Sequence, residues 1–104
     1  MTEAEIIKKV WKLFKKIVRD CQYDLYLFGS RSTRNHTKYS DFDFCVVGEK
    51  PVSSKKINKL KEAIENMDTL YSIDVVDFQK ASLEFREIVE KEMVKIIDGK
   101  IRSA

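Results

Sequence analysis

Two aspartates at alternating positions follow a glycine–serine pair in this sequence: Gly29-Ser30 stands ahead of the run Ser40-Asp41-Phe42-Asp43. Residues two apart in a strand point to the same side, so Asp41 and Asp43 are expected to project together. A third acid, Asp74, lies in another apolar run, Ile73–Phe78. A turn of phosphate-binding size beside three carboxylates is the set of groups that metal-assisted nucleotidyl transfer requires.

The aspartate pair is predicted to bind divalent metal ions. Two neighbouring carboxylates repel each other, and a cation between them removes that cost. Mg²⁺ prefers oxygen ligands, and two such ions about 4 Å apart can activate an attacking hydroxyl and stabilise departing pyrophosphate. Asp74 is our candidate for holding the second ion and taking the nucleophile's proton. Asp77 is the alternative, although it is expected to face the opposite side of the same strand.

The glycine–serine pair is predicted to form an anion site. Gly29 directly follows a strand, and glycine lets the backbone turn sharply and approach a ligand closely. Amides exposed at such a turn bind anions, and the Ser30 hydroxyl adds a donor. The pair lacks the Gly-Lys-Ser/Thr ending of a Walker loop and the three spaced glycines of a dinucleotide fingerprint. By itself it favours a plain turn, and only its link to the aspartates makes it informative.

Cationic and imidazole side chains lie between the turn and the aspartates: Arg31, Arg34, His36 and Lys38. They either neutralise triphosphate charge or belong to a solvated loop. We include Arg31 and Ser40 with the glycine–serine pair in the expected nucleotide-binding set. His36 is the only histidine, so zinc sites and histidine-paired nucleophiles have no support.

Hydrophobic spacing and capping residues predict the elements that position these side chains. Thr2 and Glu5 have capping-box spacing at the start of a helix whose apolar residues repeat as far as Val18. Strands are expected over 24–28, 42–47 and 70–78, with a turn or one short helix within 30–38.

Two more helices complete the expected order. Ser53 or Ser54 caps one that reaches Met67, and Ser82 caps a last helix that Gly99 stops. The last helix is expected to turn these residues inward: Phe85, Ile88, Val89, Met93, Ile96 and Ile97. The order predicts an α+β fold in a single domain spanning residues 1–104.

Composition restricts the class of protein. Apolar residues make up 43% and charged residues 36% of the 104 residues, which is typical of a globular domain. A net charge of +3 permits phosphate-bearing ligands without indicating a nucleic-acid binder. The cysteines, Cys21 and Cys45, are far apart, and Cys45 is expected in the core of a cytoplasmic protein. No apolar run approaches membrane-spanning length.

The first predicted helix is basic on one side and broadly apolar on the other. Its lysines form a solvated face or attract polyphosphate or RNA. Trp11 and Leu13 flank the apolar stripe on opposite sides, so the stripe serves either the core alone or a second contact as well.

The motifs Gly29-Ser30, Ser40-Asp41-Phe42-Asp43 and Ile73-Asp74-Val75-Val76 together resemble those of the DNA-polymerase-beta-like nucleotidyltransferase superfamily. Length and element order resemble its minimal branch, and the resemblance runs from about Asp24 to the last helix. It implies a small mixed β-sheet flanked by helices, the nucleotidyltransferase fold. It also implies that Gly29 and Ser30 hold the triphosphate of ATP and that the three aspartates hold two Mg²⁺ ions.

The same resemblance implies a partner. Relatives in this branch are often encoded beside an all-helical HEPN protein, and several such pairs resemble toxin–antitoxin systems in which the nucleotidyltransferase adenylylates a tyrosine of a HEPN RNase. We therefore expect transfer of AMP from ATP to a hydroxyl of such a partner. Larger relatives carry a second helical domain over the substrates. Here we expect a partner chain or a second copy to complete the pocket, with the apolar side of the first helix and Trp11 as a candidate docking surface.

One position departs from the family. Arg34 stands where a second glycine is common, and a bulky side chain there either distorts the phosphate cradle or supplies a cation to the triphosphate. The alternative function is a binding module that blocks a HEPN RNase by covering it, with a vestigial site. An RNA-binding domain built on the basic helix is a weak third interpretation, because no stacking aromatics alternate with the basic residues.

Overall fold

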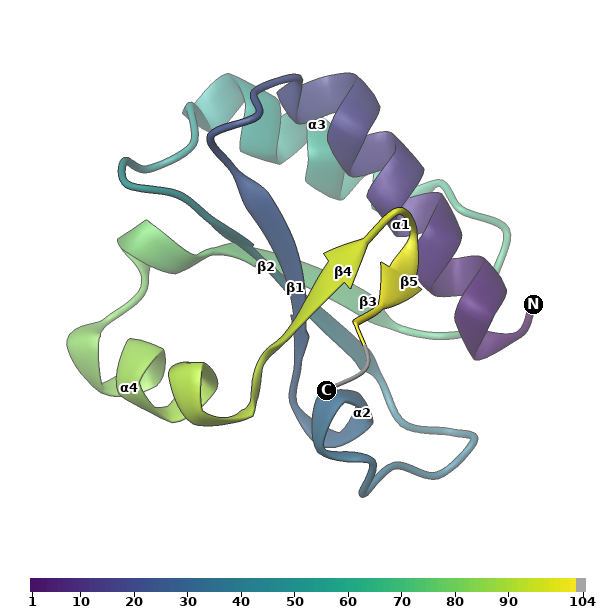
Figure 1. Cartoon of the computed structure of the whole chain (residues 1–104). Coiled ribbons are helices and arrows are strands. Elements are labelled where there is room, and N and C mark those ends of the chain that lie inside the picture. The colour runs from purple at the N-terminus through teal and green to yellow at the C-terminus, as the bar shows by residue number, and fades with distance from the viewer. Residues whose placement is uncertain (103–104) are drawn as a thin grey trace.

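Helices lie on both faces of one five-stranded sheet in the computed structural model, which describes residues 1–102 (Figure 1). The elements in chain order are α1 (Glu3–Val18), β1 (Asp24–Phe28), α2 (Ser30–Thr33), β2 (Phe42–Val47), α3 (Ser54–Glu65), β3 (Ile73–Asp77), the 3₁₀ helix η1 (Phe78–Lys80), α4 (Leu83–Glu92), β4 (Val94–Ile97) and β5 (Lys100–Ile101). The strand order is β3-β2-β1-β4-β5, with β2 and β3 parallel and the other neighbours antiparallel. The predicted α+β class, with a mixed sheet, is confirmed.

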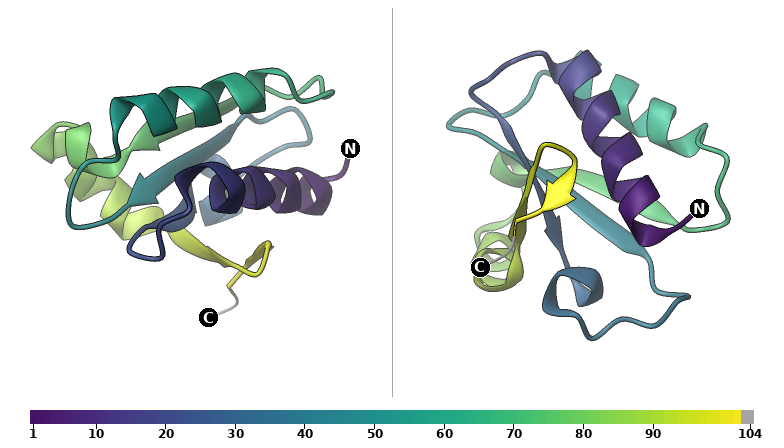
Figure 2. Two further views of the ribbon diagram at one scale, coloured as in Figure 1. Left: turned by 90° about the horizontal axis from the view of Figure 1, so that it is seen from above. Right: turned by 45° about the vertical axis from the view of Figure 1, so that its right-hand side comes forward.

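The first helix begins as predicted. Thr2 Oγ1 accepts a hydrogen bond from the Glu5 amide at 3.2 Å, and Glu5 Oε1 accepts one from the Thr2 amide at 3.1 Å, which completes the capping box. Figure 2 shows α1 and α3 side by side over one face of the sheet. The buried side chains of α1 belong to the main hydrophobic core on that face. None of the helices within residues 1–102 combines the length and the apolarity needed to cross a membrane.

Side chains of β2 alternate between two clusters. Phe42, Phe44 and Val46 join the core beneath α1 and α3, whereas Cys45 joins a smaller cluster beneath α4. Burial raises the pKa of the Cys45 thiol to about 12, which fits an inert core cysteine. Asp43 has the parity of Cys45 and therefore lies on the α4 face of the sheet.

The end of the chain is a β-hairpin, so the prediction of one helix from Ser82 to Gly99 is wrong. α4 ends at Glu92, and β4 then pairs with β1. Asp98 and Gly99 have φ values of 51° and 77°, as a two-residue type I′ turn requires. An Asp-Gly pair between branched residues is a hairpin signal that the helical spacing concealed.

Burial within this region also departs in part from the prediction. Ile96 is buried as expected, but Ile88 and Ile97 are exposed. The third strand is shorter than predicted: it begins at Ile73, and Leu70 before it is fully exposed.

The hairpin covers part of the surface that was a candidate for docking. Gly99 lies against Lys8 and Trp11 of α1, and the Trp11 side chain is half-buried against the core. Leu13, on the other flank of the helix, packs against the same core. The broad apolar side of α1 is therefore used within this chain, and a docking surface around Trp11 loses its support.

Gly99→Ala should lower the free energy of unfolding by about 1–2 kcal/mol. Gly99 has φ +77°, and a Cβ there would lie 3.3 Å from Lys8 Cγ. Gly99→Asn is the matched control, because asparagine adopts left-handed conformations more readily and should lose less stability. Urea denaturation followed by circular dichroism gives both values. An alanine variant as stable as the wild type would contradict the hairpin turn.

Candidate active site

The parallel pairing of β2 with β3 places two of the predicted acids side by side. Asp43 and Asp74 are register partners, each the second residue of its strand. Directly opposite residues of a sheet share a face, so both side chains leave the sheet on the α4 side. Asp41 is exposed and stands immediately before β2. The backbone thus brings all three acids to one end of the sheet.

The three carboxylates are near one another without converging on one point. Among residues 1–102, no three His, Cys, Asp or Glu side chains are grouped closely enough to hold a metal ion. The Asp74 side chain is exposed, and its Oδ1 accepts a hydrogen bond from the Val75 amide at 3.0 Å. Like charges stay apart when nothing neutralises them. Carboxylate oxygens are nevertheless the donors that Mg²⁺ prefers, so the chemistry of the set fits this cation.

The arrangement of these acids disfavours the ionised form of Asp43. Partial burial raises the pKa of Asp43, and the charges of Asp74, Asp41 and Glu92 raise it further. Four carboxylates therefore influence one another at this end of the sheet. A divalent cation would remove much of the cost of keeping Asp43 ionised.

A sharp turn between β1 and α2 lies directly against Asp43. Phe28, at the end of β1, is the register partner of Asp43, and Gly29 then adopts φ 78° and ψ −158°. A Cβ on Gly29 would lie 2.8 Å from Asp43 Oδ2, which is too close for carbon and oxygen. The position therefore requires glycine both for its φ and for this contact. The turn that begins with Gly29-Ser30 therefore lies directly against Asp43, one of the three predicted acids.

A fourth acid, Glu92, reaches the same turn from the end of α4. Its Oε1 accepts a hydrogen bond from the Gly29 amide at 3.1 Å. The sequence analysis missed Glu92, because it is 63 residues from Gly29 and lay within the segment assigned to a long helix. No local pattern identifies such a contact.

Arg31 is a structural residue of the loop that follows the turn. Its side chain is 3% exposed, and its guanidinium carbon lies 3.9 Å from the centroid of the Phe42 ring. It donates hydrogen bonds to the Ser40 carbonyl at 3.1 Å, to Glu3 at 3.3 Å and to the Thr37 carbonyl at 3.4 Å. The Ser40 hydroxyl in turn accepts from the Thr37 amide. The Arg31 side chain is thus engaged by the loop and by α1, and the nucleotide contacts expected of Arg31 and Ser40 stay a prediction.

Arg34 has a left-handed backbone, with φ 64°, at the end of α2. This conformation favours glycine, so arginine here carries backbone strain. The guanidinium donates to both carboxylate oxygens of Glu3, at 3.0 and 3.1 Å. Neither a distorted cradle nor a cation for the triphosphate is supported, because the side chain is held against α1. His36 Nε2 also lies near Glu3, at 3.8 Å.

The alternative third acid, Asp77, has a structural role. Its Oδ2 accepts from the Val52 amide at 2.7 Å, and its Oδ1 accepts from the Gln79 amide at 3.2 Å. The side chain is buried between these donors. The preference for Asp74 over Asp77 agrees with these positions.

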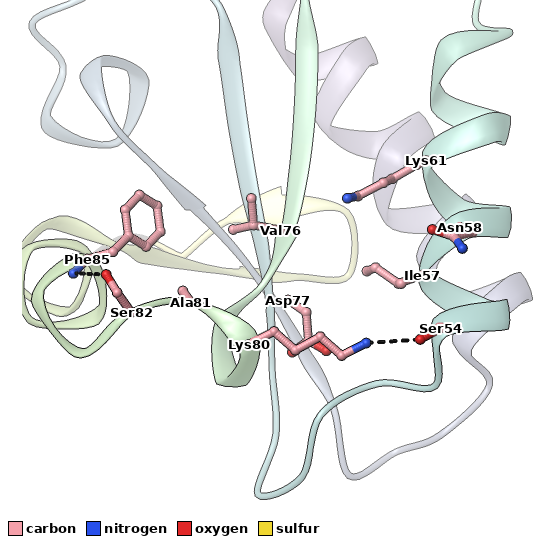
Figure 3. Close-up of a pocket in the computed structure, with 10 residues that line it drawn as sticks. All are labelled: Ser54, Ile57, Asn58, Lys61, Val76, Asp77, Lys80, Ala81, Ser82 and Phe85. Atoms are coloured by element: carbon pink, nitrogen blue, oxygen red, sulfur yellow. Dashed lines mark hydrogen bonds between the residues drawn. The ribbon is translucent and has the colours of Figure 1, made fainter.

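Two cavities lie near opposite ends of β3. One of about 450 Å³ borders Asp41 and is lined by Lys38, Tyr39 and residues 69–72. A second, of about 540 Å³, lies beside Asp77 between α3 and α4 (Figure 3). Despite its larger volume, the second cavity is lined by none of the three predicted acids. We therefore associate the site with the first cavity.

Comparison with known proteins identifies the family. The family model described as polymerase beta, nucleotidyltransferase matches residues 6–101. The chain belongs to the polymerase beta nucleotidyltransferase family. A probable protein adenylyltransferase, MntA, from Haemophilus influenzae is 33% identical over 94 residues, which cover 90% of this chain and 81% of that protein. The sequence motifs of this nucleotidyltransferase predict this family, and the match of the family model confirms it.

Solved structures share the fold of this nucleotidyltransferase. A chain of a toxin–antitoxin complex with AMP-PNP matches with a TM-score of 0.60 and 22% identity, over 90% of this chain and 72% of that chain. A chain from a complex of tri-AMPylated Shewanella oneidensis HEPN toxin with MNT antitoxin matches with a TM-score of 0.55 and 21% identity, over 88% of this chain and 70% of that one. At these identities the likeness concerns the fold, and it confirms the predicted sheet flanked by helices.

Arg34→Gly in this nucleotidyltransferase should change the free energy of unfolding by less than about 1 kcal/mol, because relief of the left-handed strain offsets loss of the exposed ion pair with Glu3. Arg34→Ala loses the ion pair and keeps the strain. It should be about 1 kcal/mol less stable than the glycine variant. Urea denaturation measures both variants. Equal stabilities would contradict a left-handed backbone at residue 34.

Asp43→Asn should raise the melting temperature of the metal-free protein at neutral pH. The folded state raises the pKa of Asp43 above its value in the unfolded chain. Ionisation of Asp43 therefore lowers the free energy of unfolding as pH rises through the raised pKa. The advantage of the variant should therefore shrink as pH falls from the raised pKa of Asp43 towards the ordinary aspartate value of 3.8, and little of it should be left below that value. Melting curves in EDTA at a series of pH values measure this. Asp68→Asn, at an exposed acid, is the control, and an equal gain there would contradict a special cost at Asp43.

Proposed function

We propose that this nucleotidyltransferase is an antitoxin that transfers AMP from ATP to a tyrosine hydroxyl of an all-helical HEPN partner in a Mg²⁺-dependent reaction. The observation that carries the proposal is the pairing of Asp43 with Asp74 beside the turn at Gly29. The relative at 33% identity is a probable protein adenylyltransferase. One of the structural neighbours comes from a complex that contains a tri-AMPylated HEPN toxin. Both comparisons support this reaction and this class of partner.

Each residue of the site has a role that suits its position. The turn formed by Gly29 and Ser30 binds the triphosphate through the amide and hydroxyl of Ser30, because the Gly29 amide already donates to Glu92. Asp74 is exposed at the start of β3, where it can take the proton of the acceptor hydroxyl. The acceptor oxygen then bonds to the α-phosphorus of ATP. The bond from that phosphorus to the oxygen bridging to the β-phosphate breaks, and pyrophosphate leaves.

The aspartates Asp41, Asp43 and Asp74 are the residues that would hold two Mg²⁺ ions. Bound Mg²⁺ supplies charge neutralisation and orientation for the reacting phosphate. The residues themselves contribute oxygen donors: Asp43 and Asp74 stand opposite each other on neighbouring strands, and Asp41 immediately precedes β2. Partial burial raises the pKa of Asp43 and three neighbouring carboxylates raise it further, and a bound cation would offset both costs of ionisation, which supports this assignment.

The open side of the site suits a protein acceptor. The cavity of about 450 Å³ beside Asp41 is bordered by Tyr39 and Leu70, which are 79% and 107% exposed. Exposed apolar side chains grouped beside a site are typical of protein contact surfaces. We expect the partner segment that bears the acceptor tyrosine to bind here and complete the pocket. The setting we propose is the cytoplasm, where free Cys21 and Cys45 stay reduced.

The transfer is tested with ATP labelled at the α-phosphate, Mg²⁺ and the cognate HEPN protein. The wild type should label the partner, and Asp43→Asn and Asp74→Asn should each lower the rate by about 100-fold or more, because each removes a metal ligand or the base. EDTA should stop the reaction, and phenylalanine in place of the acceptor tyrosine should prevent labelling.

Asp68→Asn serves as the control, since Asp68 is an exposed acid outside the site. An unlabelled partner with the wild type, or equal labelling with Asp43→Asn, rules out the enzymatic proposal. A folded variant with all three aspartates replaced separates the two functions in cells. If it still neutralises the toxin, direct covering of the partner is the function instead.

A further inference from the structure

Glu92 holds the backbone amide at the centre of the turn. Its Oε1 accepts from the Gly29 N–H at 3.1 Å in a partly buried contact. Gly29 has a backbone conformation that favours glycine, and it lies against Asp43. One side chain thus connects the last residue of α4 to the turn beside the carboxylates.

This position is electrostatically unfavourable for Glu92 apart from that hydrogen bond. Glu92 ends α4, where the helix dipole disfavours negative charge. Its charge also adds to the burial and to the charges of Asp74 and Asp41 that raise the pKa of Asp43. A residue that conflicts with its local surroundings in two ways is typical of functional sites.

The helix that carries Glu92 is itself anchored beside the turn. Phe85 of α4 meets Phe28 edge to face, with ring centroids 5.6 Å apart. Val89, one turn before the end of α4, is buried in the same cluster. Phe28 directly precedes Gly29. Residues of α4 therefore contact two consecutive residues of the chain, one through Phe85 and the next through Glu92. These contacts with a packed helix restrict the backbone of Gly29, which as a glycine would otherwise have wide conformational freedom.

We propose that Glu92 is a positioning residue whose hydrogen bond fixes the Gly29 peptide, so that the turn beside Asp43 presents the amide and hydroxyl of Ser30 to the phosphates of a nucleoside triphosphate. Glu92 acts through the Gly29 amide and not through its own charge. The identity of the ligand rests on the proposed function. The contact between Glu92 and Gly29 does not.

Two substitutions separate the hydrogen bond from the charge. Glu92→Gln keeps an oxygen acceptor at the same reach and removes the charge. Glu92→Asp keeps the charge but shortens the side chain by one methylene, so the acceptor no longer reaches the Gly29 amide. Glu90→Ala, at an exposed position of the same helix, is the matched control.

The Gly29 amide can be observed directly without nucleotide. The chain has three glycines, so labelling with ¹⁵N-glycine yields three backbone amide signals, of which Gly48 and Gly99 are internal references. We expect Glu92→Gln to keep slow hydrogen exchange at Gly29. Glu92→Asp should shift that signal and speed its exchange by about fivefold or more, as loss of one hydrogen bond implies.

Binding of AMP-PNP with Mg²⁺, measured by calorimetry, tests the consequence. Glu92→Asp should weaken binding by about five- to tenfold. Glu92→Gln and Glu90→Ala should bind within about twofold of the wild type. A melting temperature for each variant shows that the comparison is made between folded proteins.

Either of two results overturns the proposal. One is a Gln variant that binds as weakly as the Asp variant, since charge and not the hydrogen bond would then matter. The other is a Gly29 signal that Glu92→Asp leaves unchanged. A wild type that does not bind nucleotide overturns the proposed function, and the Gly29 signals then decide the positioning role by themselves.

Discussion

The parallel register of β2 with β3 determines where the chemistry of this protein lies. A slip of one residue would turn every side chain of β2 to the other face. Asp43 would then enter the core beneath α1 and α3, and Phe42 and Phe44, which fill that core, would leave it. Burying each such phenylalanine stabilises the fold by about 1.5–3 kcal/mol, so hydrophobic burial sets the register. Hydrophobic burial therefore keeps Asp43 and Asp74 side by side, although their charges repel each other.

The turn between β1 and α2 is held from both faces of the sheet. On one face, Glu3 in the first turn of α1 pairs with Arg31 and Arg34 and so secures the loop that leads to the aspartates. Although partial burial opposes it, hydrogen bonding from Arg34 and Arg31 lowers the pKa of Glu3. On the other face, Glu92 of α4 holds the Gly29 amide. Two acids outside the predicted motif, Glu3 and Glu92, therefore support the turn and the loop that precede the aspartates.

Features with a local signal could be predicted from the sequence, and features that depend on distant contacts could not. The cap at Thr2 and the bounds 42–47 follow from spacing, and the structure places Asp74, the preferred third acid, opposite Asp43. Residues 93–97 continue the helical spacing of α4, and only the Asp-Gly pair after them favours a hairpin. The burial of Arg31 and the contact of Glu92 depend on segments far apart in sequence, so no periodicity reveals them.

Charge at the site also restricts the form in which a nucleotide can bind. Asp41, Asp74 and Glu92 already act on Asp43, and a free triphosphate would add further negative charge beside them. The Gly29 amide faces Glu92, so it offers that charge little compensation. The same triphosphate accompanied by Mg²⁺ relieves the repulsion that the metal-free protein contains. In the reaction we propose, nucleotide and metal ions should therefore bind with positive coupling, because each removes a cost that opposes the other.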